Sequence, residues 1–159
     1  MDYIIRRIKQ EEYPLLRDFL YEAIFIPEGV EPPPRTILDQ PELQIYIDGF
    51  GSSVHDRAFV AESGGRVVGA VWVRIMNDYG HVDNETPSFA ISLYKDFRGY
   101  GIGTQMMRTM LDELKNAGYS QASLAVQKAN YAVKMYKKTG FRVVDENEEE
   151  YIMVCVFDK

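Results

Sequence analysis

The most informative segment of the sequence reads Leu93-Tyr94-Lys95-Asp96-Phe97-Arg98-Gly99-Tyr100-Gly101-Ile102-Gly103-Thr104. It joins an apolar run that predicts a strand, residues 88–93, to a run with apolar side chains at helical spacing, residues 102–114. Backbone N–H groups at the start of a helix have no partner within the helix, and the helix dipole favours an anion there. Glycine has no Cβ and lets a phosphate approach the backbone. The three alternating glycines therefore predict a loop that binds a phosphate or pyrophosphate.

Two common phosphate-binding motifs do not match this segment. A P-loop requires Gly-x4-Gly-Lys-Ser/Thr, and no lysine follows Gly103. The dinucleotide fingerprint requires Gly-x-Gly-x-x-Gly, but Thr104 or Met106 replaces its third glycine, depending on the register. That motif also needs an acidic residue about 20 positions further on, and residues 119–121 carry no carboxylate. Both motifs are therefore excluded.

A second segment, residues 124–141, combines a strand-like run, Asn130, a helical run that contains Tyr136, and a final Gly-Phe pair. With Arg98-x-x-Gly-x-Gly103, it resembles the two characteristic motifs of the GNAT superfamily of N-acetyltransferases. The two segments occur in the family's order, with one helix between them. They span residues 89–141, about a third of the 159-residue chain.

The pattern of apolar runs indicates a mixed α/β (α+β) fold class. We expect strands at 3–8, 57–63, 66–76, 88–93, 121–126, 141–145 and 151–157, and helices within 11–24, 41–47, 102–117 and 129–139. The proline-rich residues 25–56 are the least regular part, and a substrate lid and a plain surface connection are both compatible with them. The resemblance implies a single domain over residues 1–159. Its central, mostly antiparallel sheet would splay between the fourth and fifth strands, flanked by helices.

The resemblance also implies acetyl-CoA, or coenzyme A, as the co-substrate. Its pantetheine would lie between the splayed strands and pair with the first of them as an added strand would. The positions carried over for this pairing are Ile91, Ser92 and Leu93. Those carried over for the cofactor loop are Arg98, Gly99, Tyr100, Gly101, Ile102, Gly103 and Thr104. Asn130 matches an asparagine that contacts the cofactor in the family.

The implied reaction is the transfer of an acetyl group from acetyl-CoA to a primary amine of a small molecule or peptide, by direct attack. Such a transfer needs a proton acceptor for the amine and a proton donor for the leaving thiolate. Tyr136 matches the family position of the donor, a general acid, although its apolar stripe also suits a core tyrosine. The alternative function is a regulatory module of the same fold that binds acyl-CoA without turnover.

The proton acceptor is where the sequence departs from the family. Some members place a glutamate directly before the valine that corresponds to Val126, and here that position is Ala125. We take Glu85, at the entry to the strand 88–93, as the candidate general base. The alternatives are Asp83, Glu22, Glu28 or an ordered water.

Composition excludes several other classes. The net charge of −6 and the pI of about 5.0 argue against nucleic acid as a partner. No apolar run approaches the ~18 residues of a membrane helix. The first residues lack the apolar segment of a secretory signal, so we expect a cytoplasmic location without membrane association.

The remaining polar and thiol residues predict no metal site and no disulfide. Cys155 is the only cysteine and lies in an apolar run, which predicts a buried structural thiol. His55 and His81 are solitary, and we expect both on the surface or in loops. The acidic run 146–150 predicts a solvated turn. A homodimer is compatible with the sequence, but no feature decides the oligomeric state.

Overall fold

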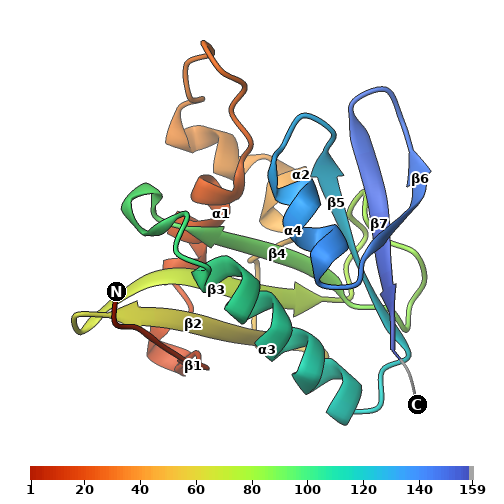
Figure 1. The fold of residues 1–159 in the computed structure, drawn as a ribbon, viewed down its shortest axis with the longest axis horizontal. Helices are drawn as coiled ribbons and strands as arrows, with labels where there is room; N and C mark the ends of the chain where they lie inside the picture. The colour runs from red at the N-terminus through yellow and green to blue at the C-terminus, as the bar shows by residue number, and fades with distance from the viewer. Residues whose placement is uncertain (158–159) are drawn as a thin grey trace.

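The computed structural model describes residues 1–157, which form a mixed, seven-stranded sheet (Figure 1). The strands run across the sheet in the order β1-β2-β3-β4-β5-β7-β6. Neighbouring strands are antiparallel except β4 and β5, which are parallel. The strands are β1 (Ile4–Arg7), β2 (Arg57–Ser63), β3 (Arg66–Arg74), β4 (Ser88–Leu93), β5 (Gln121–Gln127), β6 (Arg142–Glu146) and β7 (Glu150–Val156).

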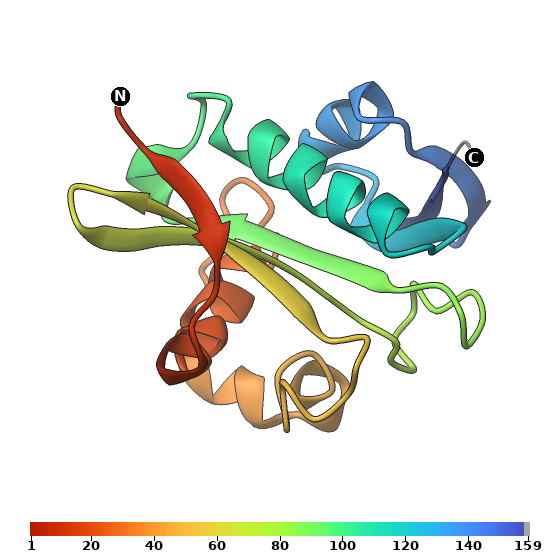
Figure 2. The ribbon, with the colours of Figure 1, turned by 90° about the horizontal axis from the view of Figure 1, so that it is seen from below.

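Helices cover both faces of this sheet, as Figure 2 shows. On one face lie α3 (Ile102–Asn116) and α4 (Ala132–Lys138), and on the other lie α1 (Leu15–Ala23) and α2 (Pro41–Gln44). The 3-10 helices are η1 (Gln10–Glu12), η2 (Arg35–Asp39) and η3 (Lys95–Phe97). The predicted fold class, a mostly antiparallel sheet flanked by helices, is confirmed.

Each face of the sheet buries its own hydrophobic cluster. The first cluster packs the apolar stripe of α3 against the sheet, and its fully buried members include Met106, Met110 and Leu114. The second packs α1 against the opposite face, where Phe19 contacts the cluster that contains Trp72. Complete burial of such side chains stabilises the fold by about 1.5–3 kcal/mol each. The two clusters fix the sheet between its helix layers.

The sheet opens between β4 and β5. These strands share one register pair, Ser88 with Ser123, whereas β3 and β4 pair along the whole length of β4. The closed end is held by hydrogen bonds from the Ser123 N–H to the Pro87 carbonyl (2.9 Å) and from the Ser123 hydroxyl to the Gly80 carbonyl (2.7 Å). A Cβ on Gly80 would lie 3.0 Å from the backbone nitrogen of Ala125, so glycine permits this close approach. The predicted splay between the fourth and fifth strands is confirmed.

The strands and α-helices follow the predicted order along the chain; the differences lie at their ends, in the 3-10 helices and in the order of the strands across the sheet. The last helix begins at Ala132 and not at residue 129, because the Asn130 side-chain oxygen accepts a hydrogen bond from the Ala132 N–H (2.9 Å) and caps the helix start. The 3-10 helix η2 lies where only a loop was predicted. β7 inserts between β5 and β6, an order that the linear pattern does not reveal.

One ion-pair cluster ties the N-terminal strand to its neighbours. The Arg6 guanidinium donates to both carboxylate oxygens of Glu12, at 2.9 Å each, and to Glu62 at 2.9 Å. Glu12 also accepts from the Lys9 N–H at 2.9 Å. The Arg6 hydrogen bonds are the largest cause that lowers the pKa of Glu12, to about 2. Since the unfolded chain has the ordinary carboxyl pKa, folding favours the ionised Glu12.

This difference predicts an acid-dependent loss of stability. A lowered folded-state pKa contributes stability that is complete above about pH 4.5 and disappears as the pH falls toward about 2. Glu12→Gln should therefore weaken this pH dependence by about 1 kcal/mol, a value discounted for solvent screening. Urea unfolding at roughly pH 5 and pH 3 measures the effect. Glu11→Gln, at an exposed neighbour, is the control, and an equal pH dependence in both variants would contradict the assignment.

Candidate active site

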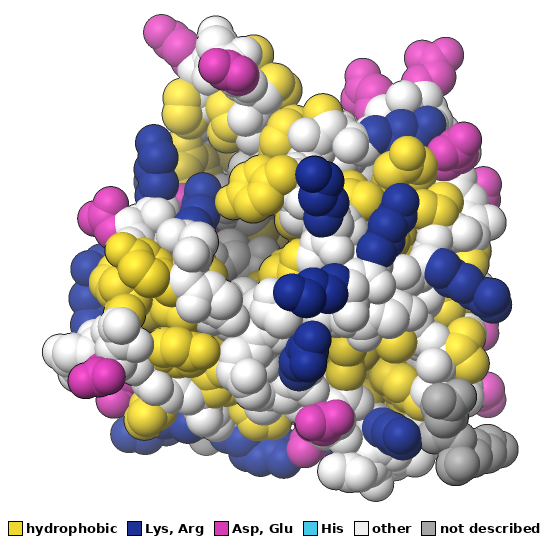
Figure 3. Space-filling model, viewed as in Figure 1, with side chains coloured by type: hydrophobic (Ala, Val, Ile, Leu, Met, Phe, Trp, Pro, Cys, Tyr) yellow, Lys and Arg dark blue, Asp and Glu magenta, His cyan; other side chains and the backbone are white. Residues whose placement is uncertain are grey.

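The larger cavity lies at the open end of the splay and has a volume of about 750 Å³. Its walls come from the end of β4, the glycine loop, α4 and the N-terminal residues 21–26. Figure 3 shows a hollow on this face, with Lys and Arg side chains gathered over α3 and α4 beside it. The exposed cations of α4 are Lys134, Lys137 and Lys138. Such a surface attracts an anionic ligand.

The glycine loop forms the anion-binding end of this cavity. Gly99 and Gly101 have φ angles of +86° and +82°, a backbone region that favours glycine. Helix α3 follows, and its first backbone hydrogen bond runs from the Gln105 N–H to the Gly101 carbonyl at 3.1 Å. The N–H groups of residues 102–104 therefore have no partner within the helix. These groups and the helix dipole make an anion site.

The edge of β4 that faces β5 forms another wall. The Tyr94 N–H donates to the Val68 carbonyl at 2.9 Å, which fixes the alternation of the β3–β4 ladder. In an antiparallel pair every second residue turns its backbone groups away from the partner. Ile91 and Leu93 thus point their N–H and C=O groups toward the opening, whereas the backbone groups of Ser92 face β3. The Ser92 hydroxyl donates to the Phe19 carbonyl at 2.6 Å.

Arg98 joins the loop to the strand edge. Its Nε donates to the Leu93 carbonyl at 2.9 Å, and its guanidinium lies 3.6 Å from the Glu22 carboxylate. The side chain of Arg98 therefore holds the loop against β4 and α1. It also lines the cavity, but its Nε–H is already engaged.

The structure brings most of the predicted cofactor residues to this one cavity. Those that line it are Ile91, Ser92, Leu93, Arg98, Gly99, Gly101, Gly103, Thr104 and Asn130. Tyr100 is not among the lining residues and has an exposed side chain. Ile102 is buried in the cluster under α3 and serves the core.

A second cavity, of about 300 Å³, lies between the diverging strands. Residues 89–91 of β4 and 124–127 of β5 line it. Both cavities share part of their walls, so they adjoin. The shared residues are Ala23, Ile24, Phe25, Ile91, Asn130 and Tyr136.

Tyr136 lies where the two cavities adjoin. Its ring is buried and contacts Phe141 edge-on, with ring centroids 6.2 Å apart. Burial, and to a lesser extent Tyr131, raises the pKa of Tyr136 to about 12. The hydroxyl is therefore protonated at neutral pH. Within residues 1–157 it forms no hydrogen bond, so the group is available as a donor.

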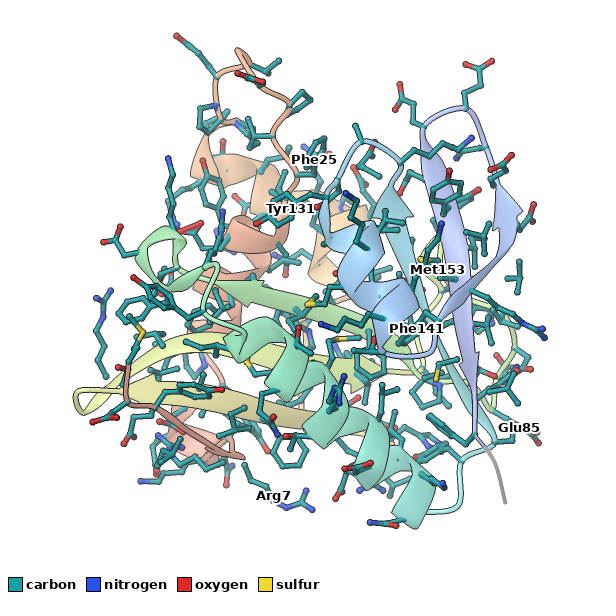
Figure 4. The ribbon with its side chains drawn as sticks, viewed as in Figure 1. Arg7, Phe25, Glu85, Tyr131, Phe141 and Met153 are labelled. Carbon is teal, nitrogen blue, oxygen red and sulfur yellow. The ribbon has the colours of Figure 1, made fainter. Side chains whose placement is uncertain are left out.

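The structure does not bring Glu85 to either cavity. Glu85 is exposed in the connection before β4, where its N–H donates to Asp83 at 2.8 Å. In Figure 4 it lies at the opposite end of the molecule from Phe25 and Tyr131, both of which line the larger cavity. Neither cavity includes it among its lining residues.

Glu150 lines the second cavity, a position that the sequence pattern does not reveal. The acidic run 146–150 was predicted to be a solvated turn, and its last member departs from that prediction. Glu150 is half-buried at the start of β7 and pairs with Gln127 of β5. The sequence places Glu150 directly before the apolar run 151–157. This position indicates a place beside the cavity only once β7 is known to lie next to β5.

The proline-rich N-terminal region is part of the site. Phe25, Ile26, Pro32 and Pro33 line the larger cavity. The Tyr21 hydroxyl donates to the Pro33 carbonyl at 2.5 Å and ties this segment to α1. The segment thus forms a wall over the open end of the splay.

The histidines and acidic residues of the described part of the chain form no metal-binding group. Within residues 1–157, no three His, Cys, Asp or Glu side chains gather where they could hold a metal ion. His55 shares a hydrogen bond with the Tyr119 hydroxyl (2.6 Å), and His81 with the Met76 carbonyl (2.9 Å). In the same part of the chain, no helix has the length and apolar character that crossing a membrane requires.

The class of the protein follows from a comparison with known families. Residues 13–141 match the family model described as the acetyltransferase (GNAT) family. The chain therefore belongs to that family, and the predicted resemblance is confirmed.

Individual relatives agree with this classification. Over 90 residues the chain is 34% identical to N-acetyltransferase 8 of Mus musculus, a match that covers 56% of this chain but only 40% of that protein. Two solved structures share the fold over 98–99% of this chain and their own full length, each at 18% identity. They are the PaiA N-acetyltransferase of Thermoplasma acidophilum in complex with coenzyme A (TM-score 0.71) and a GNAT-family acetyltransferase of Streptococcus pneumoniae (TM-score 0.70).

The glycine loop gives a direct test of the anion site. A Cβ at Gly101 would meet nothing within 4 Å, and Asp and Asn tolerate a positive φ better than other side chains. Gly101→Asp places a negative charge beside the free N–H groups, and Gly101→Asn is its neutral, matched control. We expect coenzyme A to bind the Asp variant at least about tenfold more weakly than the Asn variant. Calorimetry on the folded proteins measures this, and equal affinities would contradict the site.

Proposed function

We propose that this protein is an N-acetyltransferase that transfers an acetyl group from acetyl-CoA to a primary amine. The observation that carries the proposal is the meeting of the two cavities at Tyr136 and Ile91. The larger cavity suits the co-substrate and the smaller one suits the acceptor. The acetyl group and the amine would then meet beside a protonated phenol.

The larger cavity fits acetyl-CoA in three respects. The N–H groups of residues 102–104 suit a pyrophosphate, and the open space at Gly99 and Gly101 leaves room for it. The outward-facing N–H groups of Ile91 and Leu93 suit an extended, amide-containing chain. Its volume, about 750 Å³, is in the range of ligand-binding pockets. When bound, acetyl-CoA supplies an acetyl thioester at the junction of the cavities.

Tyr136, at the junction, supplies one of the proton transfers that the reaction needs. The ammonium group of the acceptor loses one proton to a carboxylate or water, and its nitrogen then forms a bond to the acetyl carbon as the carbon–sulfur bond breaks. Tyr136 donates its hydroxyl proton to the departing sulfur and regains a proton that leaves the nitrogen. An outward N–H group at Ile91 or Leu93 is positioned to donate to the acetyl oxygen as it gains negative charge.

Release of free thiol from acetyl-CoA, measured with a panel of primary amines, tests the function. Amine-dependent thiol release with a matching mass increase on the amine supports the proposal. Coenzyme A binding without thiol release would instead support the binding module without turnover.

Replacement of Tyr136 tests the general acid. Tyr136→Phe keeps the buried ring and removes only the hydroxyl, so we expect kcat to fall by roughly 10²-fold or more. The affinity for coenzyme A should change little. Tyr79→Phe, at an exposed tyrosine that lines neither cavity, is the matched control. An unaltered kcat under conditions in which chemistry limits the rate would show that Tyr136 has only a structural role.

A further inference from the structure

The second cavity has a distinctive lining. Among its lining residues Glu150 is the only carboxylate, and none is a lysine, arginine or histidine. Its polar groups are the hydroxyls of Tyr46 and Tyr136 and the side-chain amides of Gln127 and Asn130. The other lining residues are apolar, Leu43, Phe89 and Leu124 among them. The cavity thus combines one negative charge with apolar walls.

The backbone of Glu150 is held in place by its neighbours. Its N–H donates to the Asn147 side chain at 2.7 Å, and its carbonyl accepts from the Asn147 N–H at 3.0 Å. Its pairing with Gln127 holds it against β5. Within residues 1–157, the carboxylate accepts no hydrogen bond and forms no ion pair. Burial, followed by the charge of Glu149, raises its pKa. A bound cation would satisfy this group.

A second carboxylate lies behind the wall of the cavity. The Tyr46 hydroxyl donates to Asp78 at 2.9 Å, and the Ser88 hydroxyl donates to the same oxygen at 2.8 Å. The other Asp78 oxygen is buried and has no hydrogen-bond partner among residues 1–157. Because the Tyr46 proton points to Asp78, the lone pairs of the Tyr46 oxygen remain available to accept a hydrogen bond. Burial, Asp78 and Glu150, in that order, raise the pKa of Tyr46.

We propose that the second cavity takes a compact, apolar primary amine with a single positive charge, whose ammonium group pairs with the Glu150 carboxylate and the Tyr46 hydroxyl. This assignment deepens the proposed function and rests on it. An alkylamine or arylalkylamine without a carboxylate fits this description. The third N–H direction of the ammonium remains free to face the junction at Tyr136.

The same lining disfavours other classes of amine. A polyamine would place a second ammonium group against apolar walls, and an unpaired buried charge is costly. An amino acid would bring its carboxylate beside Glu150, with Asp78 behind, where like charges repel. The volume of about 300 Å³ lies at the lower end for ligand pockets and suits a compact body.

Calorimetry with two isosteric probes tests the assignment. The protein is first saturated with coenzyme A, and 2-phenylethylamine or its neutral analogue 2-phenylethanol is then titrated. Spermidine and phenylalanine represent the disfavoured classes. The variant is Glu150→Gln, and the matched control is Glu148→Gln, at an exposed glutamate of the same turn that lines neither cavity. These binding measurements do not require turnover.

We expect wild type to bind the amine about tenfold or more tightly than the alcohol, as a charged hydrogen bond predicts. Glu150→Gln should remove that preference through a loss of amine affinity, with the alcohol unaffected. Glu148→Gln should behave as wild type. Spermidine and phenylalanine should each bind about tenfold or more weakly than 2-phenylethylamine. Equal affinities for amine and alcohol, a preference unchanged in Glu150→Gln, or tighter binding of either disfavoured compound would overturn the assignment.

The failure of this assignment is distinguishable from the failure of the proposed function. If coenzyme A does not bind wild type, the proposed function falls and this assignment falls with it. If coenzyme A binds and thiol is released in a Tyr136-dependent way, but Glu150→Gln leaves the amine preference intact, only this assignment falls.

Discussion

The single register pair between β4 and β5 is the constraint on which the rest of the structure depends. A parallel pair normally continues along both strands, and the twist of a sheet alone does not separate them. Here the pairing stops after Ser88 and Ser123. Because β3 and β7 pair fully with the outer edges of the two strands, each strand keeps its extended form after the separation. The unpaired inner edges then become walls of the cavities.

The backbone N–H and C=O groups on the separated edges need hydrogen-bond partners. The surroundings of these groups differ between β4 and β5. On β4, the Leu93 carbonyl is taken by Arg98, while the outward N–H groups remain accessible to a ligand. On the β5 side, Glu150 of β7 and Tyr136 of α4 line the cavity beside the strand. The hydrogen bond from Arg98 thus holds the glycine loop against the end of β4 at Leu93.

Local signals explain which parts were predictable from sequence. The glycine loop and α3 follow from residues adjacent in the chain: alternating glycines, then a helical stripe such as Met106 and Met110. The motif around Tyr136 is local in the same sense. The position of Glu150 depends on the insertion of β7 between β5 and β6, a pairing between distant segments. The position of Glu85 depends on the fold in the same way, because it precedes β4 in the chain and this strand runs from the closed end of the splay, at Ser88, to the open end, at Leu93.

The division of the site into two adjoining cavities has an evolutionary consequence. Gly99, Gly101 and Thr104 of the glycine loop line only the larger cavity, whereas Leu43, Tyr46 and Glu150 line only the smaller one. These two groups lie on segments far apart in sequence, and residues such as Tyr136 line both cavities. Mutations in the turn before β7 or in α2 can therefore reshape one compartment while the other keeps its geometry. Such a division allows related proteins to change the ligand of one cavity while they keep the ligand of the other.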